Sequence, residues 1–172
     1  MDKLQRAILE IGNEEIPRGS NWGIHVQKYL KAVGINSPNP WCMAFVYWCV
    51  ENSNALQSNI IGGMSNPLVK TGGVLKQWND IDIHYLSKFN PGTQIKFQEP
   101  KQGDIFIMDY GKGLGHTGFV ESVDKDGIYI HTIEGNTNDE GSREGFEVCR
   151  MKRKISSCKG FIRLPNQQDV LI

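Results

Sequence analysis

The spacing of apolar residues changes from helical to strand-like at about residue 93, and this change constrains the fold more than any other feature. Before it, apolar periodicity and capping residues predict helices at about residues 2–11, 22–33, 40–53 and 74–79. After it, short β-type runs between turn residues predict strands at Thr93–Phe97, Asp104–Asp109, Thr117–Val123, Ile128–Ile133, Phe146–Met151 and Gly160–Leu164. Because helices precede strands without alternating with them, the sequence indicates an α+β domain with an antiparallel sheet.

Composition limits the number of domains and the class of partner. A chain of 172 residues with 39% hydrophobic and 22% charged residues predicts one globular domain over residues 1–172. Nineteen basic side chains balance nineteen acidic ones, so no net charge attracts nucleic acid or an anionic membrane. We interpret the basic run Lys152–Lys154 as a solvated strand end or turn, and we expect no nucleic-acid partner.

The N-terminus and the cysteines bear on localisation. Residues Met1–Gly12 read as an amphipathic helix and lack the features of a secretory signal. No apolar run reaches about 18 residues, so we expect no membrane span. The four cysteines form no C-x-x-C pair, which favours free thiols in a reducing compartment: Cys42, Cys49, Cys149 and Cys158. We expect a monomer that is synthesised in the cytoplasm without a signal peptide.

Cys42 is the first catalytic candidate. Asn39 is a favoured N-cap and Pro40 suits the first helical position, which places Cys42 in the first turn of an almost wholly apolar helix. The unpaired N–H groups and the positive end of the helix dipole favour a thiolate there. Since the thiolate is the nucleophilic form of cysteine, we predict that Cys42 attacks a substrate.

His116 is the best placed of the four histidines to act as the base. It lies in the segment Gly113–Val120, where glycines such as Gly115 leave room at the mouth of a strand for a ligand. The dipeptide Asp126-Gly127 predicts a hairpin turn. Antiparallel pairing about that turn places His116 opposite about residue 135.

Glu134 and Asn136 are therefore the predicted partners of His116, since strand alternation puts both on one face. We expect Glu134 to accept the Nδ1–H of His116 and to hold Nε2 toward Cys42, while Asn136 orients the imidazole or polarises the substrate. The alternative is a solvated turn, because residues Glu134–Asp139 have a loop-like composition. Strand register decides between these interpretations, and we favour the catalytic one.

Four motifs occur in a characteristic order: Trp41–Val46, Gly103-Asp104 opening a strand, Gly115–Gly118 and Glu134–Asn136. With them the chain resembles, over roughly residues 4–164, the CHAP family of cysteine, histidine-dependent amidohydrolases/peptidases. The resemblance implies a papain-like fold, with N-terminal helices packed on a C-terminal antiparallel sheet of about five to six strands. It also implies cleavage of amide bonds in bacterial peptidoglycan, with Cys42 as nucleophile, His116 as base, Glu134 as orienting acid and Asn136 as an auxiliary polar residue.

Three further residues are candidates for substrate binding. Trp41 adjoins the nucleophile and either walls the substrate groove or packs in the core. Asn21 borders the cleft or caps a helix, and Gly115 leaves room beside the base. Some family members carry an acidic calcium-binding loop before the nucleophile, whereas this chain has Gly34–Asn39 there, so we expect no metal and no cofactor.

The leading hypothesis is a peptidoglycan hydrolase that works through a cysteine acyl-enzyme, either an N-acetylmuramoyl-L-alanine amidase or a stem or cross-bridge endopeptidase. A phage lysin and an interbacterial effector are equal candidates, acting at the wall after lysis or dedicated secretion. One alternative is a non-catalytic module that binds muropeptide, for example in a phage tail. Another is a cysteine protease or amidotransferase that acts on protein.

Overall fold

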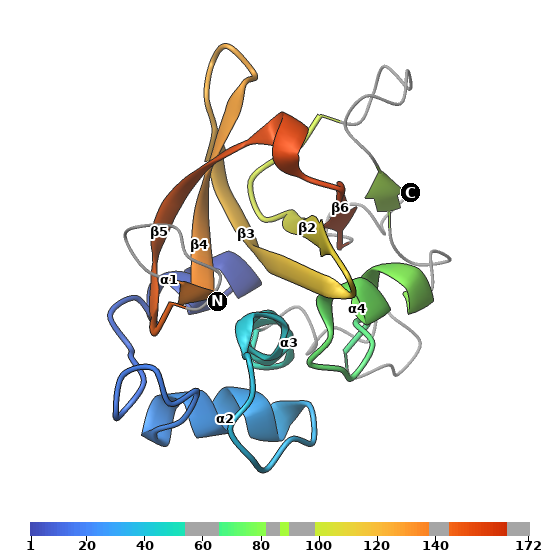
Figure 1. Ribbon diagram of the computed structural model, residues 1–172. Helices are drawn as coiled ribbons and strands as arrows, with labels where there is room; N and C mark the ends of the chain where they lie inside the picture. The colour runs from blue at the N-terminus through green and yellow to red at the C-terminus, as the bar shows by residue number, and fades with distance from the viewer. Residues whose placement is uncertain (54–65, 82–86, 90–98, 138–144, 165–172) are drawn as a thin grey trace.

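The computed structural model describes residues 1–53, 66–81, 87–89, 99–137 and 145–164. Within these residues four α-helices come first, namely α1 (Lys3–Ile8), α2 (Ile24–Ala32), α3 (Cys42–Glu51) and α4 (Val74–Asp80) (Figure 1). The strands follow as β1 (Ser87–Phe89), β2 (Ile105–Gly111), β3 (Leu114–Val123), β4 (Tyr129–Thr137), β5 (Glu147–Lys154) and β6 (Gly160–Arg163). The predicted α+β fold, with N-terminal helices on a C-terminal antiparallel sheet, is confirmed.

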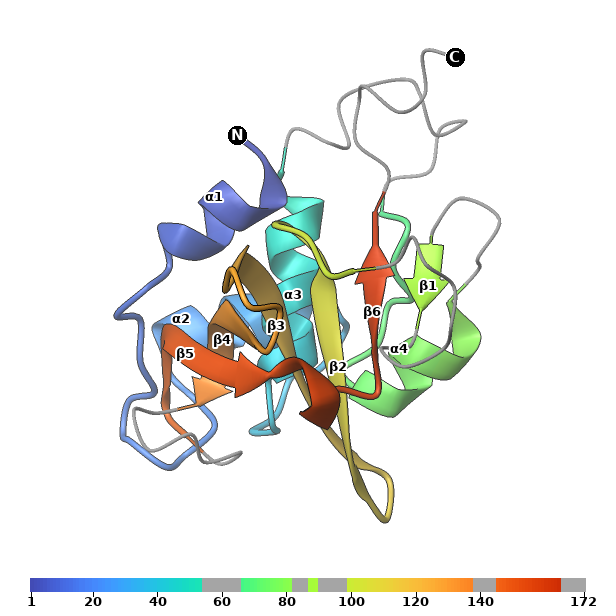
Figure 2. The ribbon, with the colours of Figure 1, turned by 90° about the horizontal axis from the view of Figure 1, so that it is seen from above.

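The strands form one six-stranded antiparallel sheet in the order β1-β6-β2-β3-β4-β5. Hairpins join β2 to β3 and β3 to β4, whereas β5 and β6 follow each other in sequence but are separated by three strands. The connection between them therefore crosses one face of the sheet, through the short 3₁₀ helix Ile155–Ser157 (Figure 2).

Helix α3 lies between the sheet and α2 (Figure 1). Its sequence is apolar on all sides, and such a helix is expected to be buried. Eight of its residues are indeed buried: Cys42, Met43, Ala44, Phe45, Val46, Tyr47, Cys49 and Val50. The main core surrounds this helix, so the start of α3 is held in a fixed position relative to β3 and β4.

A second, smaller cluster of buried apolar side chains lies on strands β2, β3, β4 and β6 and on the segment before β6: Phe106, Met108, Val120, Ile130, Cys158 and Phe161. Ile155, in the connection that crosses the sheet, packs against it. Apolar side chains are therefore excluded from water on this side of the sheet as well. The strand residues that carry the polar side chains of the site are buried beside this cluster.

Several element boundaries differ from those predicted. Helix α3 starts at Cys42 with Trp41 as its N-cap, two residues later than Pro40, so Cys42 is the first helical residue. Strand β1 was not predicted, and the predicted strand Thr93–Phe97 lies outside the described residues. Within the part of the chain that the structure describes, no helix has the length and hydrophobicity needed to cross a lipid bilayer.

Candidate active site

Cys42 occupies the first position of α3 and is 5% exposed. The N–H groups of a first helical turn have no carbonyl partners inside the helix, and they form the positive end of its dipole. Trp41 contributes no side-chain cap to these groups. The sulfur therefore lies where an anion is favoured, as the sequence predicted.

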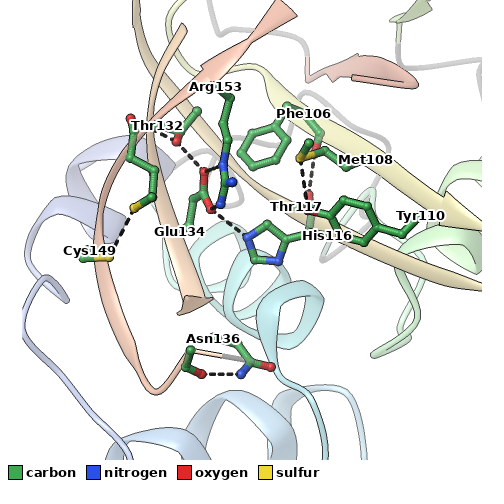
Figure 3. Close-up of polar contacts among 12 residues, drawn as sticks. Phe106, Met108, Tyr110, His116, Thr117, Thr132, Glu134, Asn136, Cys149 and Arg153 are labelled. Carbon is green, nitrogen blue, oxygen red and sulfur yellow. Dashed lines mark hydrogen bonds and ion pairs between the residues drawn. The ribbon is translucent and has the colours of Figure 1, made fainter. Parts of the chain in front are cut away.

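His116 lies on β3 and is completely buried. Its Nε2 is 2.7 Å from Oε2 of Glu134 on β4 (Figure 3). Its Nδ1 is also buried and makes no hydrogen bond of normal geometry with any described residue. The two ring nitrogens thus have the opposite roles to those predicted, because Nε2 meets the carboxylate and Nδ1 is the nitrogen left for Cys42.

Glu134 is held by four polar contacts from three side chains. Besides Nε2 of His116, Oε2 accepts a hydrogen bond from Nη2 of Arg153 at 2.6 Å. Oε1 accepts from Nε of Arg153 at 2.9 Å and from the Thr132 hydroxyl at 2.5 Å (Figure 3). These contacts fix the carboxylate in one plane and leave it completely buried.

The charges of the pair support each other. Burial lowers the pKa of His116, but contacts with Cys42 and Glu134 oppose this effect and raise the pKa to about 9. Burial raises the pKa of Glu134, but hydrogen bonds from Arg153 and His116 reverse it and hold the pKa at about 2. At neutral pH the site therefore contains an imidazolium beside a carboxylate.

Gly118 explains how the Glu134 side chain reaches His116. Gly118 lies directly opposite Glu134 in the β3–β4 ladder, two residues along β3 from His116. A Cβ atom on Gly118 would lie 2.9 Å from Cγ of Glu134 and 2.5 Å from the carbonyl oxygen of Ile133. The missing side chain therefore leaves the space that the Glu134 side chain crosses.

A pocket of about 370 Å³ opens beside Cys42. Its wall includes Gly115 and Asn136 from the sheet, together with Ile35, Pro40 and Thr71 to Val74. None of the described side chains that line it carries a charge. Gly115 packs closely against its neighbours, since a Cβ there would lie 2.7 Å from the carbonyl oxygen of Met108 and 3.1 Å from Val74.

Asn136 was predicted to orient His116 or to polarise the substrate, but its hydrogen bonds go to other residues. The β4–β5 register shifts after Glu134, and Asn136 has a positive φ of 58°. Its Oδ1 accepts the backbone N–H of Trp41 at 2.9 Å, and its Nδ2 donates to the carbonyl oxygen of Gly145 at 2.6 Å. Asn136 therefore fixes the residue before the nucleophile, and these bonds do not involve His116.

Trp41 packs in the core and does not wall the groove with its ring. The side chain is completely buried and stacks on Tyr29, with ring centroids 5.5 Å apart. Its indole N–H donates to Glu15 at 2.8 Å, and the other oxygen of Glu15 accepts the backbone N–H of Asn21 at 2.9 Å. Asn21 is half-buried, and its Oδ1 lies 3.4 Å from Nδ2 of Asn136, so this residue belongs to the same network.

Sequence reasoning missed Arg153 and Glu15. Glu15 is 2% exposed and lies in a loop whose composition gives no sign of a buried acid. For Arg153 a signal does exist, because Cys149, Met151 and Arg153 alternate along β5 with side chains that face solvent.

Among the described residues, no group of three or more His, Cys, Asp or Glu side chains is arranged to hold a metal ion.

A family model described as the CHAP domain matches residues 34–136, which contain Cys42, His116, Glu134 and Asn136. The match covers more than half of the chain. The protein belongs to the CHAP domain family. The helix start that carries the cysteine and the strand that carries the histidine form the papain-like arrangement implied by the sequence resemblance. Family membership supports a peptidoglycan hydrolase in general terms.

Two solved structures show distant similarity to this CHAP domain protein. The crystal structure of a wild type endolysin, LysIME-EF1, is 20% identical, with a TM-score of 0.38 over 49% of this chain and 39% of that chain. The crystal structure of Ly7917 is 18% identical, with a TM-score of 0.46 over 88% of this chain and 62% of that chain. The matches span less than two thirds of either of those proteins. No curated protein sequence matches the chain.

Proposed function

We propose that the protein is a peptidoglycan hydrolase that cleaves an amide bond of the cell-wall peptide through a cysteine acyl-enzyme, as an amidase or an endopeptidase. The observation that carries the proposal is the buried His116–Glu134 pair beside a cysteine at a helix start. A module that only binds muropeptide needs no such pair, whereas acyl transfer needs a nucleophile, a base and a group that orients the base. In this proposal residues 1–172 form one catalytic domain.

The first half of the reaction joins the substrate to Cys42. The thiolate sulfur attacks the carbonyl carbon of the amide, and the carbonyl oxygen becomes an oxyanion. The backbone N–H of Cys42, at the start of α3, is the donor nearest to that oxygen in such an attack. His116, protonated at Nδ1, then gives this proton to the amine nitrogen as the C–N bond breaks.

The second half releases the acyl group. With the amine gone, Nδ1 of His116 is neutral and accepts a proton from water, whose oxygen attacks the thioester carbon. The C–S bond breaks, and the free carboxylic acid and the Cys42 thiolate are formed. Glu134 keeps its bond to Nε2 throughout and thus fixes the ring plane during both proton transfers.

The test is zymography on purified sacculi with wild type, Cys42→Ala and Cys49→Ala. Cys49 is completely buried in the same helix and does not line the pocket, so it serves as the matched control. We expect clearing by wild type and Cys49→Ala and none by Cys42→Ala. Clearing that persists in Cys42→Ala would refute the cysteine mechanism, and absence of clearing by wild type would favour the muropeptide-binding or protein-substrate alternatives.

Mass spectrometry of the released fragments identifies the bond. A new lactyl carboxyl on muramic acid means amidase, and a new amino terminus in the stem or cross-bridge means endopeptidase.

A further inference from the structure

Arg153 is a partly buried cation that contacts the candidate catalytic acid from outside the segment matched by the family model. It lies on β5, whereas the match ends at residue 136. Its side chain is only 12% exposed. Two of its nitrogens, Nε and Nη2, bond the two different oxygens of Glu134, at 2.9 and 2.6 Å. This forked geometry is the strongest and most directional form of a charged contact with a carboxylate.

Among the described residues, Glu134 has one cationic partner besides Arg153, namely His116. The ionisable groups near the pair are His116 on β3, Tyr110 on β2, Cys42 at the start of α3 and Cys158 before β6. Of these, only His116 is a cation. When a buried carboxylate loses one of its two charged donors, its pKa rises, because low-polarity surroundings disfavour the ion and the remaining donor offsets less of that effect.

Protonation of Glu134 would change what it does for His116. A carboxylate accepts the Nε2–H of an imidazolium and stabilises the positive charge, whereas a carboxylic acid gives up most of that electrostatic support. Without it the ring would lose both its preferred charge state and the contact that turns Nδ1 toward the nucleophile. Thr132 cannot replace the missing cation, since its hydroxyl supplies one neutral hydrogen bond.

We propose that Arg153 is a positioning residue of the active site, which keeps Glu134 ionised and in plane so that Glu134 can orient His116. Arg153 is not among the described residues that line the pocket, so in this proposal it affects the reaction through Glu134 and not by contact with the substrate. The kinetic test of this proposal rests on the proposed function, whereas the NMR test does not.

The experiment compares Arg153→Met, Arg153→Lys and Arg150→Met. Arg150 is the matched control, because it lies on the same strand and makes a similar fork to Glu121 at the exposed surface. The first measurement is the pH dependence of kcat/KM on a soluble muropeptide. The second is the pH titration of the imidazole signals of His116 by NMR with ¹⁵N-labelled histidine, which needs no substrate.

For Arg153→Met we expect kcat to fall about ten- to a hundredfold with KM changed less than about twofold, as for loss of a group behind a functional histidine. We also expect a new acidic limb between about pH 4 and 7, where Glu134 takes up its proton. The NMR titration of His116 should show an added inflection in the same range. Arg153→Lys retains the charge but loses the fork, so its loss should be smaller, and Arg150→Met should match wild type.

A folded Arg153→Met protein with the wild-type pH profile and the wild-type titration of His116 would overturn the proposal. If Arg153→Met does not fold by circular dichroism, Arg153→Gln, which also removes the charge, decides, and a wild-type profile there overturns the proposal equally. If wild type does not cleave sacculi, the proposed function fails, but the NMR titration still tests the link from Arg153 through Glu134 to His116.

Discussion

The stability of the protein should depend on pH through one buried histidine. The ordinary pKa of histidine, 6.5, applies to the unfolded chain, whereas contacts with Cys42 and Glu134 outweigh burial and raise the pKa of His116 to about 9 in the folded protein. The folded state therefore binds a proton more tightly. Because one pKa unit corresponds to about 1.36 kcal/mol, the raised pKa stabilises the folded state by about 3 kcal/mol.

The sign of the effect follows from the direction of this change. Below pH 6.5 both states hold the proton, so the whole stabilisation is present. As the pH rises from 6.5 through about 9, the unfolded chain has already lost its proton while the folded protein is losing its own, and the stabilisation disappears. The free energy of unfolding should thus fall across this window by about 3 kcal/mol through His116 alone.

The assay is urea unfolding of wild type and His116→Gln from about pH 6 to pH 10, with the free energy of unfolding extrapolated to water. Other groups titrate in both proteins, so the relevant quantity is the difference between them. We expect this difference to shrink by about 3 kcal/mol between the two ends of the range. His131→Gln is the matched control, since its 2.7 Å contact with Asp124 lies at a partly exposed site where water screens the pair.

A difference that stays constant within about 0.5 kcal/mol over this range would refute the reasoning. It would mean that His116 is neutral in the folded protein at neutral pH and that the contact with Glu134 joins an uncharged ring. The same result would remove the imidazolium from the proposed first proton transfer.

Three other variants test separate parts of the site. Glu134→Gln removes a charge that raises the pKa of His116, so the alkaline limb of kcat/KM should move down from about pH 9, and an unmoved limb would contradict the pairing. Gly118→Ala places a Cβ atom 2.5 Å from a carbonyl oxygen of β4 and should cost about 1–3 kcal/mol in urea unfolding, whereas wild-type stability would show that the sheet absorbs the methyl group. Asn136→Ala leaves a buried N–H before the nucleophile without its acceptor and should destabilise the protein by about 1–3 kcal/mol, but the NMR titration of His116 should not change, since a change would restore the predicted contact between the two.

The sequence predicted that Glu134 lies beside His116, but it did not predict correctly which ring nitrogen of His116 makes the contact. Pairing about the Asp126-Gly127 turn predicted residue numbers that sum to about 251, and the observed pair of Gly118 with Glu134 sums to 252. An error of one residue in the register still leaves Glu134 beside His116, because a glutamate side chain is long enough to reach across one residue. Which ring nitrogen meets the carboxylate depends on how the imidazole turns about its side-chain bonds, and no periodic pattern in the sequence encodes that angle.

Asn136 shows a second reason why alternation fails. The predicted shared face for Glu134 and Asn136 requires an unbroken strand, but the register of β4 against β5 shifts between Glu134 and Thr137. An irregularity of this kind turns one side chain out of its alternating position. Asn tolerates the positive φ that results, and its amide then bonds backbone groups on either side of the site.

The prediction that Arg153 is solvated was wrong, because it treated Lys152–Lys154 as one solvated run. Neighbouring residues of a strand face opposite sides of the sheet. Lys152 and Lys154 are exposed, whereas Arg153 between them is directed toward Glu134, as period two along a strand requires. Burial of a lone arginine would be costly, so a cation on the inward face of a strand implies an anion opposite it. Glu134 was predicted to be the acid that orients His116. The two expectations, combined across β4 and β5, predict the ion pair between Arg153 and Glu134, the candidate catalytic acid.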